Sequence, residues 1–254
     1  MIGIFLSNVF QTAEKLGLNQ RQMLEIIKEI GYGYVEADWN QIRKMPNDFF
    51  EMMKELQLKI SLYVFINTNC FIENDNHIAD DIERISELGI NKLMLVWNSS
   101  SDETNEEAKK NILLNSEKIF SEADRVGIQI LAEDFDSLTL PCASTKDLIL
   151  YHKNLPGLGF TFDTGNFLIH NEDIYESFEL MRNNIKHVHI KDRFSATEHS
   201  QAVDPGTGKL PIKEIIHKLF DNKYNGWITA ELPYGKASID VYKETYDLIK
   251  DNFC

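Results

Sequence analysis

The sequence predicts a single-domain α/β fold, one (β/α)8 barrel spanning residues 1–254. Eight short runs rich in β-branched and aromatic residues recur along the chain, and a longer stretch with helical spacing of apolar residues follows each run. Eight parallel strands with their helices need about 250 residues in a barrel, whereas an open doubly wound sheet would leave strands over. No low-complexity linker divides the chain, so one domain is the simplest organisation.

The expected strands are short apolar runs that turn signals separate: Ile2 to Leu6, Tyr34 to Ala37, Lys59 to Phe65, Lys92 to Val96, Gln129 to Ala132, Gly159 to Phe162, His187 to Ile190, and Trp227 to Ala230. The expected helices repeat apolar residues every three or four positions: Gln20 to Ile30, Asn47 to Leu56, Ile78 to Leu88, Asn105 to Val126, Thr145 to Tyr151, Ile174 to Asn183, Ile212 to Phe220, and Val241 to Lys250.

Helix boundaries carry residues suited to them. The expected N-terminal caps are Asn19, Asn47 and Ser144. The glycines expected in a left-handed C-terminal conformation are Gly31, Gly89 and Gly127. The longest expected loop runs from Phe194 to Lys209, and a loop of that length in a compact domain is more often functional than idle.

The charge balance argues against polyanionic partners. The chain carries 26 Lys and Arg against 40 Asp and Glu, a formal net charge of −14 that repels phosphate backbones and anionic lipid. The longest basic cluster, Lys109-Lys110, is flanked by Glu106 and Glu107. We therefore expect no nucleic-acid partner and no membrane partner.

The N-terminal run and the cysteines favour a cytoplasmic protein. The first apolar run has no basic residues before it and breaks at Ser7 and Asn8, which is untypical of a signal peptide, and no run reaches the roughly 18 apolar residues of a membrane span. The three cysteines are far apart and odd in number, which argues against a disulfide framework and favours reduced thiols: Cys70, Cys142 and Cys254.

Polar residues end four consecutive barrel strands. Glu133, Asp163, His189 and Glu231 follow or end the fifth to eighth expected strands, and the carboxyl ends of barrel strands share one rim. Three carboxylates and an imidazole at one place repel one another unless a cation is bound. Such oxygen-rich ligation suits Mn²⁺, Mg²⁺ or Co²⁺ and does not exclude Zn²⁺. Each carboxylate taken alone is equally consistent with a helix cap or a solvated loop residue.

Neighbouring polar residues have two readings each. His187 shares a strand face with His189 and either packs inside the barrel or acts directly. Lys191, in register with His189, either contacts a polar substrate or is solvated. Glu36, near the end of the second strand, either binds a substrate hydroxyl or caps a helix. Trp97 and Phe135 either form an apolar wall against a sugar or pack beneath the helices.

The order of these motifs resembles the xylose isomerase-like barrel superfamily, specifically its sugar phosphate isomerase/epimerase group, over most of the chain. The segments that carry the resemblance are Leu131-Ala132-Glu133-Asp134-Phe135, Phe162-Asp163-Thr164-Gly165-Asn166, His187-Val188-His189-Ile190-Lys191-Asp192, Pro205-Gly206-Thr207-Gly208 and Thr229-Ala230-Glu231-Leu232. The resemblance implies one divalent metal ion held by Glu133, Asp163, His189 and Glu231. It does not by itself fix a substrate.

Two positions depart from the family pattern. Family epimerases usually carry a substrate-binding His three residues after the metal-binding Asp, where this chain has Asn166, which cannot carry a proton at neutral pH. Arg193 comes earlier than the family's substrate-binding Arg, and Ser195 stands near the expected place. We expect substrate contacts from Asn166, Lys191, Arg193, Trp97 and Glu36.

The implied reaction is proton transfer in a sugar or sugar phosphate through a metal-stabilised enediolate, in carbohydrate metabolism. Glu133 and Glu231 are then the catalytic pair, one removing a proton and the other returning it, which gives ketose epimerisation or aldose–ketose isomerisation. Which carboxylate is the base, which sugar is bound and whether a homo-oligomer forms stay open.

Three alternatives remain at this point. A non-catalytic barrel that binds a sugar or polyol is compatible with Asn166, and an inosose-type dehydratase would use the same ligands. An endonuclease IV-like nuclease shares the barrel, but its three metals demand more ligands than this chain's seven histidines and their spacing offer, and the net charge opposes DNA binding.

Overall fold

Eight parallel strands close into a ring in the computed structural model, which describes residues 1–67, 77–98, 104–137, 140–141, 144–195, 202–235 and 237–253. The barrel strands are β1 (Ile2–Phe5), β2 (Tyr34–Asp38), β3 (Lys59–Asn67), β4 (Lys92–Asn98), β5 (Gln129–Glu133), β6 (Gly159–Asp163), β7 (Ile185–Ile190) and β10 (Trp227–Ala230). The order around the ring is β1, β10, β7, β6, β5, β4, β3, β2, so sequence neighbours pair throughout and the predicted (β/α)8 barrel is confirmed.

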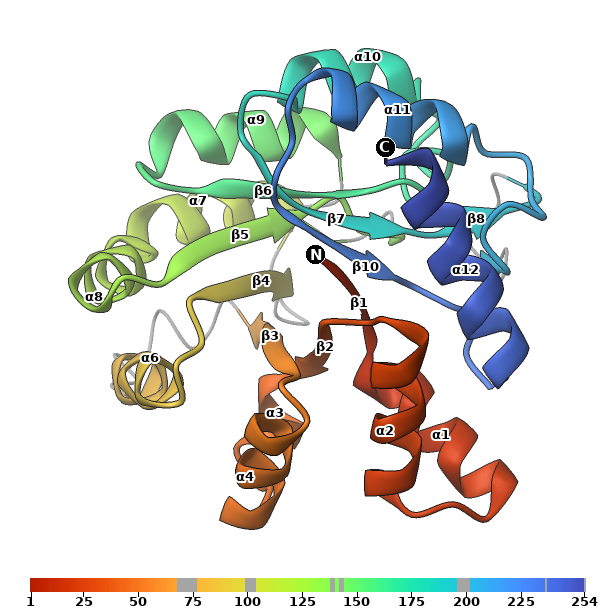
Figure 1. Ribbon diagram of the computed structural model, residues 1–254. Helices are drawn as coiled ribbons and strands as arrows, with labels where there is room; N and C mark the ends of the chain where they lie inside the picture. Colours follow the sequence, from red (N-terminus) through yellow and green to blue (C-terminus); the bar gives the residue numbers. More distant parts are fainter. Residues whose placement is uncertain are drawn as a thin grey trace.

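Helices surround the ring of strands (Figure 1). They are α1 (Leu6–Leu16), α2 (Gln20–Ile30), α3 (Trp39–Ile42), α4 (Asn47–Glu55), α6 (His77–Glu87), α7 (Asn105–Asn115), α8 (Glu117–Val126), α9 (Thr145–Asn154), α10 (Ile174–Met181), α11 (Ile212–Asp221) and α12 (Ile239–Asn252). The caps expected at Asn19 and Ser144 are confirmed, since both side chains accept backbone N–H groups of the first turn. Gly31, Gly89 and Gly127 all have positive φ, as expected.

The structure corrects three expectations about helices. The helix expected over 105–126 is divided at Ser116 into α7 and α8, although the backbone of Ser116 is helical and its N–H still donates to Ile112 O. Asn47 is the first residue of α4, and Pro46 takes the cap position. Helix α1 was missed, because it begins directly after β1 with no polar cap between them.

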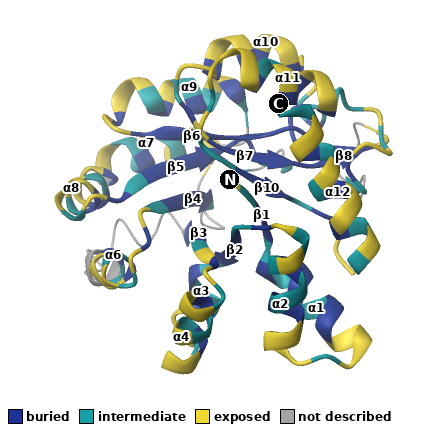
Figure 2. Ribbon diagram, in the orientation of Figure 1, coloured by how far each residue is buried: buried dark blue, intermediate teal, exposed yellow. Residues whose placement is uncertain are grey.

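The two faces of the barrel strands differ in chemistry. The barrel strands are largely buried (Figure 2), and their outward-facing side chains, such as Ile4, Leu95 and Val188, belong to the main apolar core. Polar side chains are buried on the same strands: Glu36, Ser61, Thr161, His187 and Thr229. Glu36 on β2 contacts His187 on β7, and because these strands are not neighbours the contact crosses the barrel interior. The barrel is therefore filled partly by a hydrogen-bonded polar layer beneath its carboxyl-terminal rim.

A short hairpin follows β7. Strands β8 (Asp192–Arg193) and β9 (Ala202–Val203) pair antiparallel; β8 directly precedes the loop that the sequence predicts at 194–209, and β9 lies within it. The Asp192 carboxylate accepts the N–H groups of Gly206 and Gly208, both at 2.9 Å. These hydrogen bonds hold the loop at Asp192. Both glycine N–H groups are therefore already occupied.

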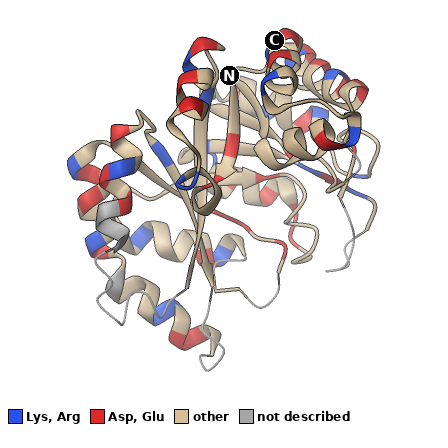
Figure 3. Ribbon diagram, turned by 90° about the horizontal axis from the view of Figure 1, so that it is seen from below, with Lys and Arg blue, Asp and Glu red and all other residues tan. Residues whose placement is uncertain are grey.

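Lys and Arg alternate with Asp and Glu on the outer helices (Figure 3). Across the described ranges, no helix is long and apolar enough to cross a membrane. The three cysteines, Cys70, Cys142 and Cys254, lie outside the described residues.

Candidate functional site

Four side chains meet at the carboxyl-terminal rim. Glu133 ends β5, Asp163 ends β6, His189 lies near the end of β7, and Glu231 directly follows β10. One ligand atom from each lies within 4.8 Å of every other. His189 Nδ1 faces all three carboxylates: it contacts Glu133 Oε1 and lies 3.6 Å from Glu231 Oε2 and 3.9 Å from Asp163 Oδ2. The rim thus brings together the four residues that the sequence predicted as metal ligands.

Asp163 is held so that one carboxylate oxygen points into this cluster. Its Oδ1 accepts the N–H groups of Gly165 at 2.6 Å and Asn166 at 3.0 Å, in the turn that follows β6. Its own N–H donates to Oδ1 of Asp134 at 3.1 Å, which ties the end of β6 to β5. The backbone therefore satisfies Oδ1 and leaves Oδ2 for the cluster.

His189 lies between two acidic groups. Its Nε2 is 3.2 Å from Glu36 Oε2, and its Nδ1 faces the rim carboxylates. Glu36 also accepts from His187 Nε2 at 2.8 Å and from the Thr229 hydroxyl. Glu36 is only 1% exposed and is hydrogen-bonded inside the barrel, so the structure does not present it as a group open to a substrate hydroxyl. Of the two readings of His187, the packed and hydrogen-bonded one agrees with this geometry.

Burial without a compensating cation disfavours ionised carboxylates here. Burial raises the pKa of the Glu133 carboxyl, with Glu231 adding to the shift and His189 opposing it. Burial also raises the pKa of Asp163 well above its usual range, with Glu231 and Glu133 adding to the shift and Lys191 opposing it. A bound divalent cation would reverse this penalty.

The pKa values of His189 and Glu36, in contrast, shift so that the charged form of each is favoured. Burial alone would lower the pKa of His189, but the carboxylates of Glu133 and Glu36 outweigh it and raise that pKa well above its usual range. Burial alone would raise the pKa of Glu36, but His187 and His189 outweigh it and lower that pKa well below its usual range. The electrostatic potential at this rim is therefore negative, which favours the binding of a cation.

The donor set fits a divalent metal ion. Glu133 Oε1 and His189 Nδ1 are buried against each other, and Asp163 Oδ2 is a buried atom of the cluster with no hydrogen-bond partner among the described residues. Buried polar atoms are rarely left unsatisfied, and a cation shared by these atoms explains their convergence. Three carboxylate oxygens and one imidazole nitrogen form a set that Mn²⁺, Mg²⁺, Co²⁺ or Zn²⁺ accepts.

Lys191 reaches into the same site from the end of β7. Its Nζ lies 2.6 Å from Glu231 Oε1 and 3.7 Å from Asp163 Oδ2, and it donates to Asn166 Oδ1 at 3.2 Å. Asn166 in turn donates to the backbone oxygen of Asp134 at 2.6 Å. The structure thus brings Lys191 and Asn166 to the cluster, and Asn166 holds the ammonium group in place.

A cavity of about 170 Å³ opens over the cluster. It is lined by Phe5, Tyr63, Phe65, Met94, Val96, Glu133, Phe135, Asp136, His189, Lys191 and Glu231. The lining combines aromatic side chains with charged ones, which is the composition of a site for a small polyhydroxylated ligand. The sequence pattern points to Phe135 but gives no role to Phe5, Tyr63, Phe65 or Asp136. Strand alternation places Tyr63 and Phe65 on one face and was the available signal.

Two further residues expected at the substrate lie elsewhere. Trp97 is fully buried and packs against Tyr151 of α9 at a centroid distance of 5.1 Å, because its neighbour Val96 faces the cavity and alternation turns Trp97 toward the helices. Arg193 is buried and donates to Asp136 Oδ2 at 2.5 Å, and it is absent from the cavity lining. The structure therefore does not bring either residue to the lining of this cavity.

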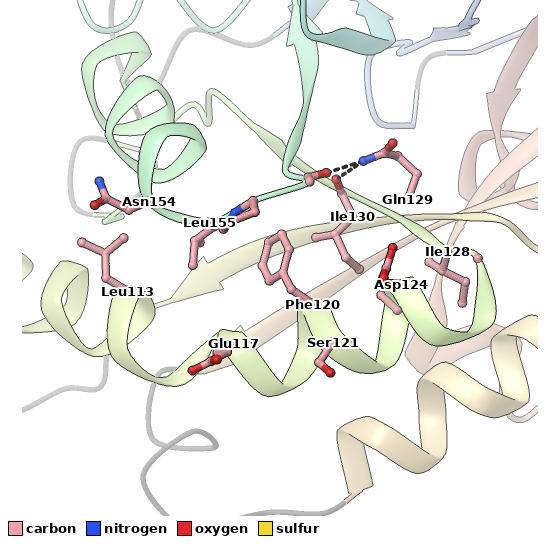
Figure 4. A pocket seen from close by; sticks show the side chains of 14 residues that line it. Leu113, Glu117, Phe120, Ser121, Asp124, Ile128, Gln129, Ile130, Asn154 and Leu155 are labelled. Atoms are coloured by element: carbon pink, nitrogen blue, oxygen red, sulfur yellow. Dashed lines mark hydrogen bonds between the residues drawn. The ribbon is translucent and has the colours of Figure 1, made fainter.

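A larger cavity of about 780 Å³ lies away from this rim (Figure 4). It is formed by α8, the start of β5 and the segment 154–157, where Gln129 Nε2 donates to the backbone oxygens of Ile130 and Gly157. It is at the opposite end of β5 from Glu133 and contains none of the clustered side chains. Barrel chemistry is found at the carboxyl ends of strands, so the smaller cavity is the functional candidate.

The turn after Asp163 has no room for a side chain at Gly165. A Cβ there would lie 2.6 Å from Cγ and 3.0 Å from Cβ of Lys191, both in the stem of that side chain. We expect Gly165→Ala to displace Lys191 and to lower the free energy of unfolding by about 1 to 3 kcal/mol, measured by urea denaturation. A change below about 0.5 kcal/mol would contradict this packing.

Comparison with known proteins agrees with this architecture. A family profile described as xylose isomerase-like TIM barrel matches residues 24–252. An inosose dehydratase from Lacticaseibacillus casei is 23% identical over 142 residues, 50% of this chain and 48% of that protein. D-psicose 3-epimerase from Clostridium cellulolyticum H10, solved with D-tagatose, has a TM-score of 0.78 at 14% identity, over 99% of this chain and 97% of that chain.

A xylose isomerase-like TIM barrel protein from Mycobacterium smegmatis, solved in complex with magnesium, has a TM-score of 0.69 at 16% identity, over 92% of this chain and 89% of that chain. At these identities the solved structures show a shared fold. The match to the curated dehydratase spans about half the length of that protein.

Proposed function

Because the chain belongs to the xylose isomerase-like TIM barrel family, we propose that it is a divalent-metal-dependent isomerase or epimerase that acts on a sugar or sugar phosphate. The single observation that carries the proposal is the convergence of three carboxylates and His189 at the carboxyl-terminal rim, where Glu133, His189 and Glu231 also line the rim cavity. Similar folds solved as a sugar epimerase and with magnesium support it.

The residues that would hold the cation are Glu133, Asp163, His189 and Glu231. When bound, the cation would polarise a carbonyl of the substrate, so that the adjacent C–H becomes acidic. The aromatic side chains of the cavity would pack against the C–H face of the sugar and exclude water from it.

Glu133 and Glu231 are the proposed acid/base pair. One carboxylate takes the proton from the carbon next to the carbonyl, and the other returns a proton. Return to the same carbon from the opposite face inverts that centre, and return to the neighbouring carbon interconverts an aldose and a ketose. Glu133 is 5% exposed, whereas the Glu231 side chain is 24% exposed, so Glu231 is the group through which solvent protons enter.

Lys191 is the proposed substrate-orienting cation. Its ammonium lines the cavity beside Glu231, where it can donate to a substrate oxygen and stabilise negative charge on it. Asn166 keeps it in this position through a direct hydrogen bond.

The same Lys191 favours a second candidate, a dehydratase. After a carboxylate has taken the proton from carbon, the bond from the β-carbon to its hydroxyl oxygen breaks, and the oxygen leaves as water with a proton from Lys191 Nζ. The similarity to an inosose dehydratase over half the chain supports this alternative.

Deuterium exchange from solvent tests both candidates. The protein loaded with Mn²⁺, Mg²⁺ or Co²⁺ is incubated in D₂O with a panel of ketoses, their phosphates and inososes, and the products are analysed by NMR. Deuterium at C1 indicates an isomerase, deuterium at C3 an epimerase, and loss of water from an inosose the dehydratase. Binding without any exchange or water loss across the panel would contradict both and leave a sugar-binding barrel.

A further inference from the structure

Glu36 is a buried acid that the proposed reaction does not use. It lies on β2 with 1% of its surface exposed, and its Oε2 is the acceptor for three groups: His187 Nε2, His189 Nε2 and the Thr229 hydroxyl. These donors come from β7 and β10, on the other side of β1 from Glu36. A single oxygen that accepts three hydrogen bonds is typical of an ionised carboxylate held rigidly in place.

The contact between Glu36 and His189 determines which nitrogen of that imidazole carries a proton. A carboxylate accepts hydrogen bonds only, so the ring nitrogen facing Glu36, Nε2, must carry a proton. In an imidazole with one N–H, the lone pair is then on Nδ1, which points at Glu133, Asp163 and Glu231. The nitrogen with the lone pair is therefore the one that faces the proposed metal position.

The ring of His189 is also fixed in orientation. Phe5 packs edge-on against it at 5.2 Å and 71°, and His187 packs edge-on from another side at 5.2 Å and 89°. Because these two rings restrict rotation of the imidazole, the hydrogen bond to Glu36 sets which nitrogen faces the rim.

We propose that Glu36 is a positioning residue for the metal site: through its hydrogen bond to Nε2 it holds His189 with Nδ1 as the metal-binding nitrogen, and it strengthens that nitrogen as a donor. Glu36 touches neither substrate nor metal. The inference rests on the proposed metal-dependent function and adds a residue from the opposite side of the barrel to it.

A Co²⁺ titration tests the proposal without any substrate. The visible absorption of bound Co²⁺ gives stoichiometry, affinity and ligand geometry for wild type, Glu36→Gln and Thr161→Val. Glu36→Gln keeps the shape of the side chain and removes its charge. Thr161→Val is the matched control, because Thr161 is a buried side chain on a barrel strand whose hydroxyl has no partner among the described residues.

We expect one Co²⁺ per wild-type chain, a Kd about 10 to 100 times higher with an altered spectrum in Glu36→Gln, and a change within about twofold in Thr161→Val. Proton NMR of the Co²⁺-loaded wild type should also show one strongly shifted, slowly exchanging N–H from His189 Nε2, and this measurement needs no variant.

The outcomes separate the two proposals. Wild-type binding with an unchanged Kd and spectrum in Glu36→Gln, or a rapidly exchanging His189 N–H in wild type, would overturn the role of Glu36 and leave the metal site standing. Two Co²⁺ per chain would also overturn it, because an ion among Glu36, His187 and His189 would replace the hydrogen bonds. Failure of wild type to bind Co²⁺ would overturn both proposals.

Discussion

Glu231→Gln is expected to lower solvent deuterium exchange into the substrate by about 10³-fold or more, because one change removes both a proton-transfer group and a charged metal ligand. Glutamine keeps the shape of the side chain, and Glu231 N–H still continues the pairing of β10 with β7 through Ile190 O. The barrel should therefore stay folded. The measurement is the exchange rate by NMR at saturating metal, with folding checked by circular dichroism.

Glu244→Gln is the matched control, since it changes the net charge equally at an exposed position of α12 and should leave the exchange rate unchanged. Glu133→Gln should behave like Glu231→Gln. Retained exchange in both site variants would contradict the assignment of these two carboxylates as the acid/base pair.

Asp163→Asn is expected to weaken metal binding by more than about 100-fold and yet to leave the metal-free protein at least as stable as wild type. The amide keeps an oxygen for the N–H groups of Gly165 and Asn166 and replaces a buried carboxylate whose pKa is raised well above its usual range. An acid with a raised folded-state pKa destabilises the fold above its unfolded pKa, so at neutral pH its removal stabilises the metal-free barrel.

Thermal unfolding with and without metal measures both effects. Metal at 100 times its Kd stabilises wild type by about 2.7 kcal/mol, which raises Tm by roughly 5 to 10 °C, and it should leave Asp163→Asn unchanged at the same concentration. A metal-free Tm that falls by several degrees in Asp163→Asn, or an equal metal-induced rise in both proteins, would be inconsistent with the site.

Much of the fold could be predicted from local patterns. All eight strands and seven of the eight expected helices form within a few residues of their predicted bounds, because the alternation of apolar runs and helical periods is strong along this chain. Helix α1 lacked a polar cap, and the two-residue strands β8 and β9 are too short to carry a period. Their formation depends on contacts that the local sequence does not encode.

The candidate site, too, could be predicted only in part from local sequence patterns. Strand-end positions predicted that Glu133, Asp163, His189 and Glu231 would meet, since parallel strands end at one rim. Two things decide which side chains reach the cavity: which residues of a strand face the barrel interior, and how deep along the barrel axis each residue lies. Trp97 lies on the strand face that is turned away from the cavity, Glu36 is buried inside the barrel, and Arg193 is paired with Asp136 from a loop.

Anomalous diffraction from crystals of the protein grown with Mn²⁺ would locate the metal ion and its ligands. We expect one Mn²⁺ per chain at the carboxyl-terminal rim, with Glu133, Asp163, Glu231 and His189 Nδ1 as ligands at about 2.2 Å. No manganese peak at that rim, or a peak held by other side chains while these four stay paired with one another and with Lys191, would contradict it.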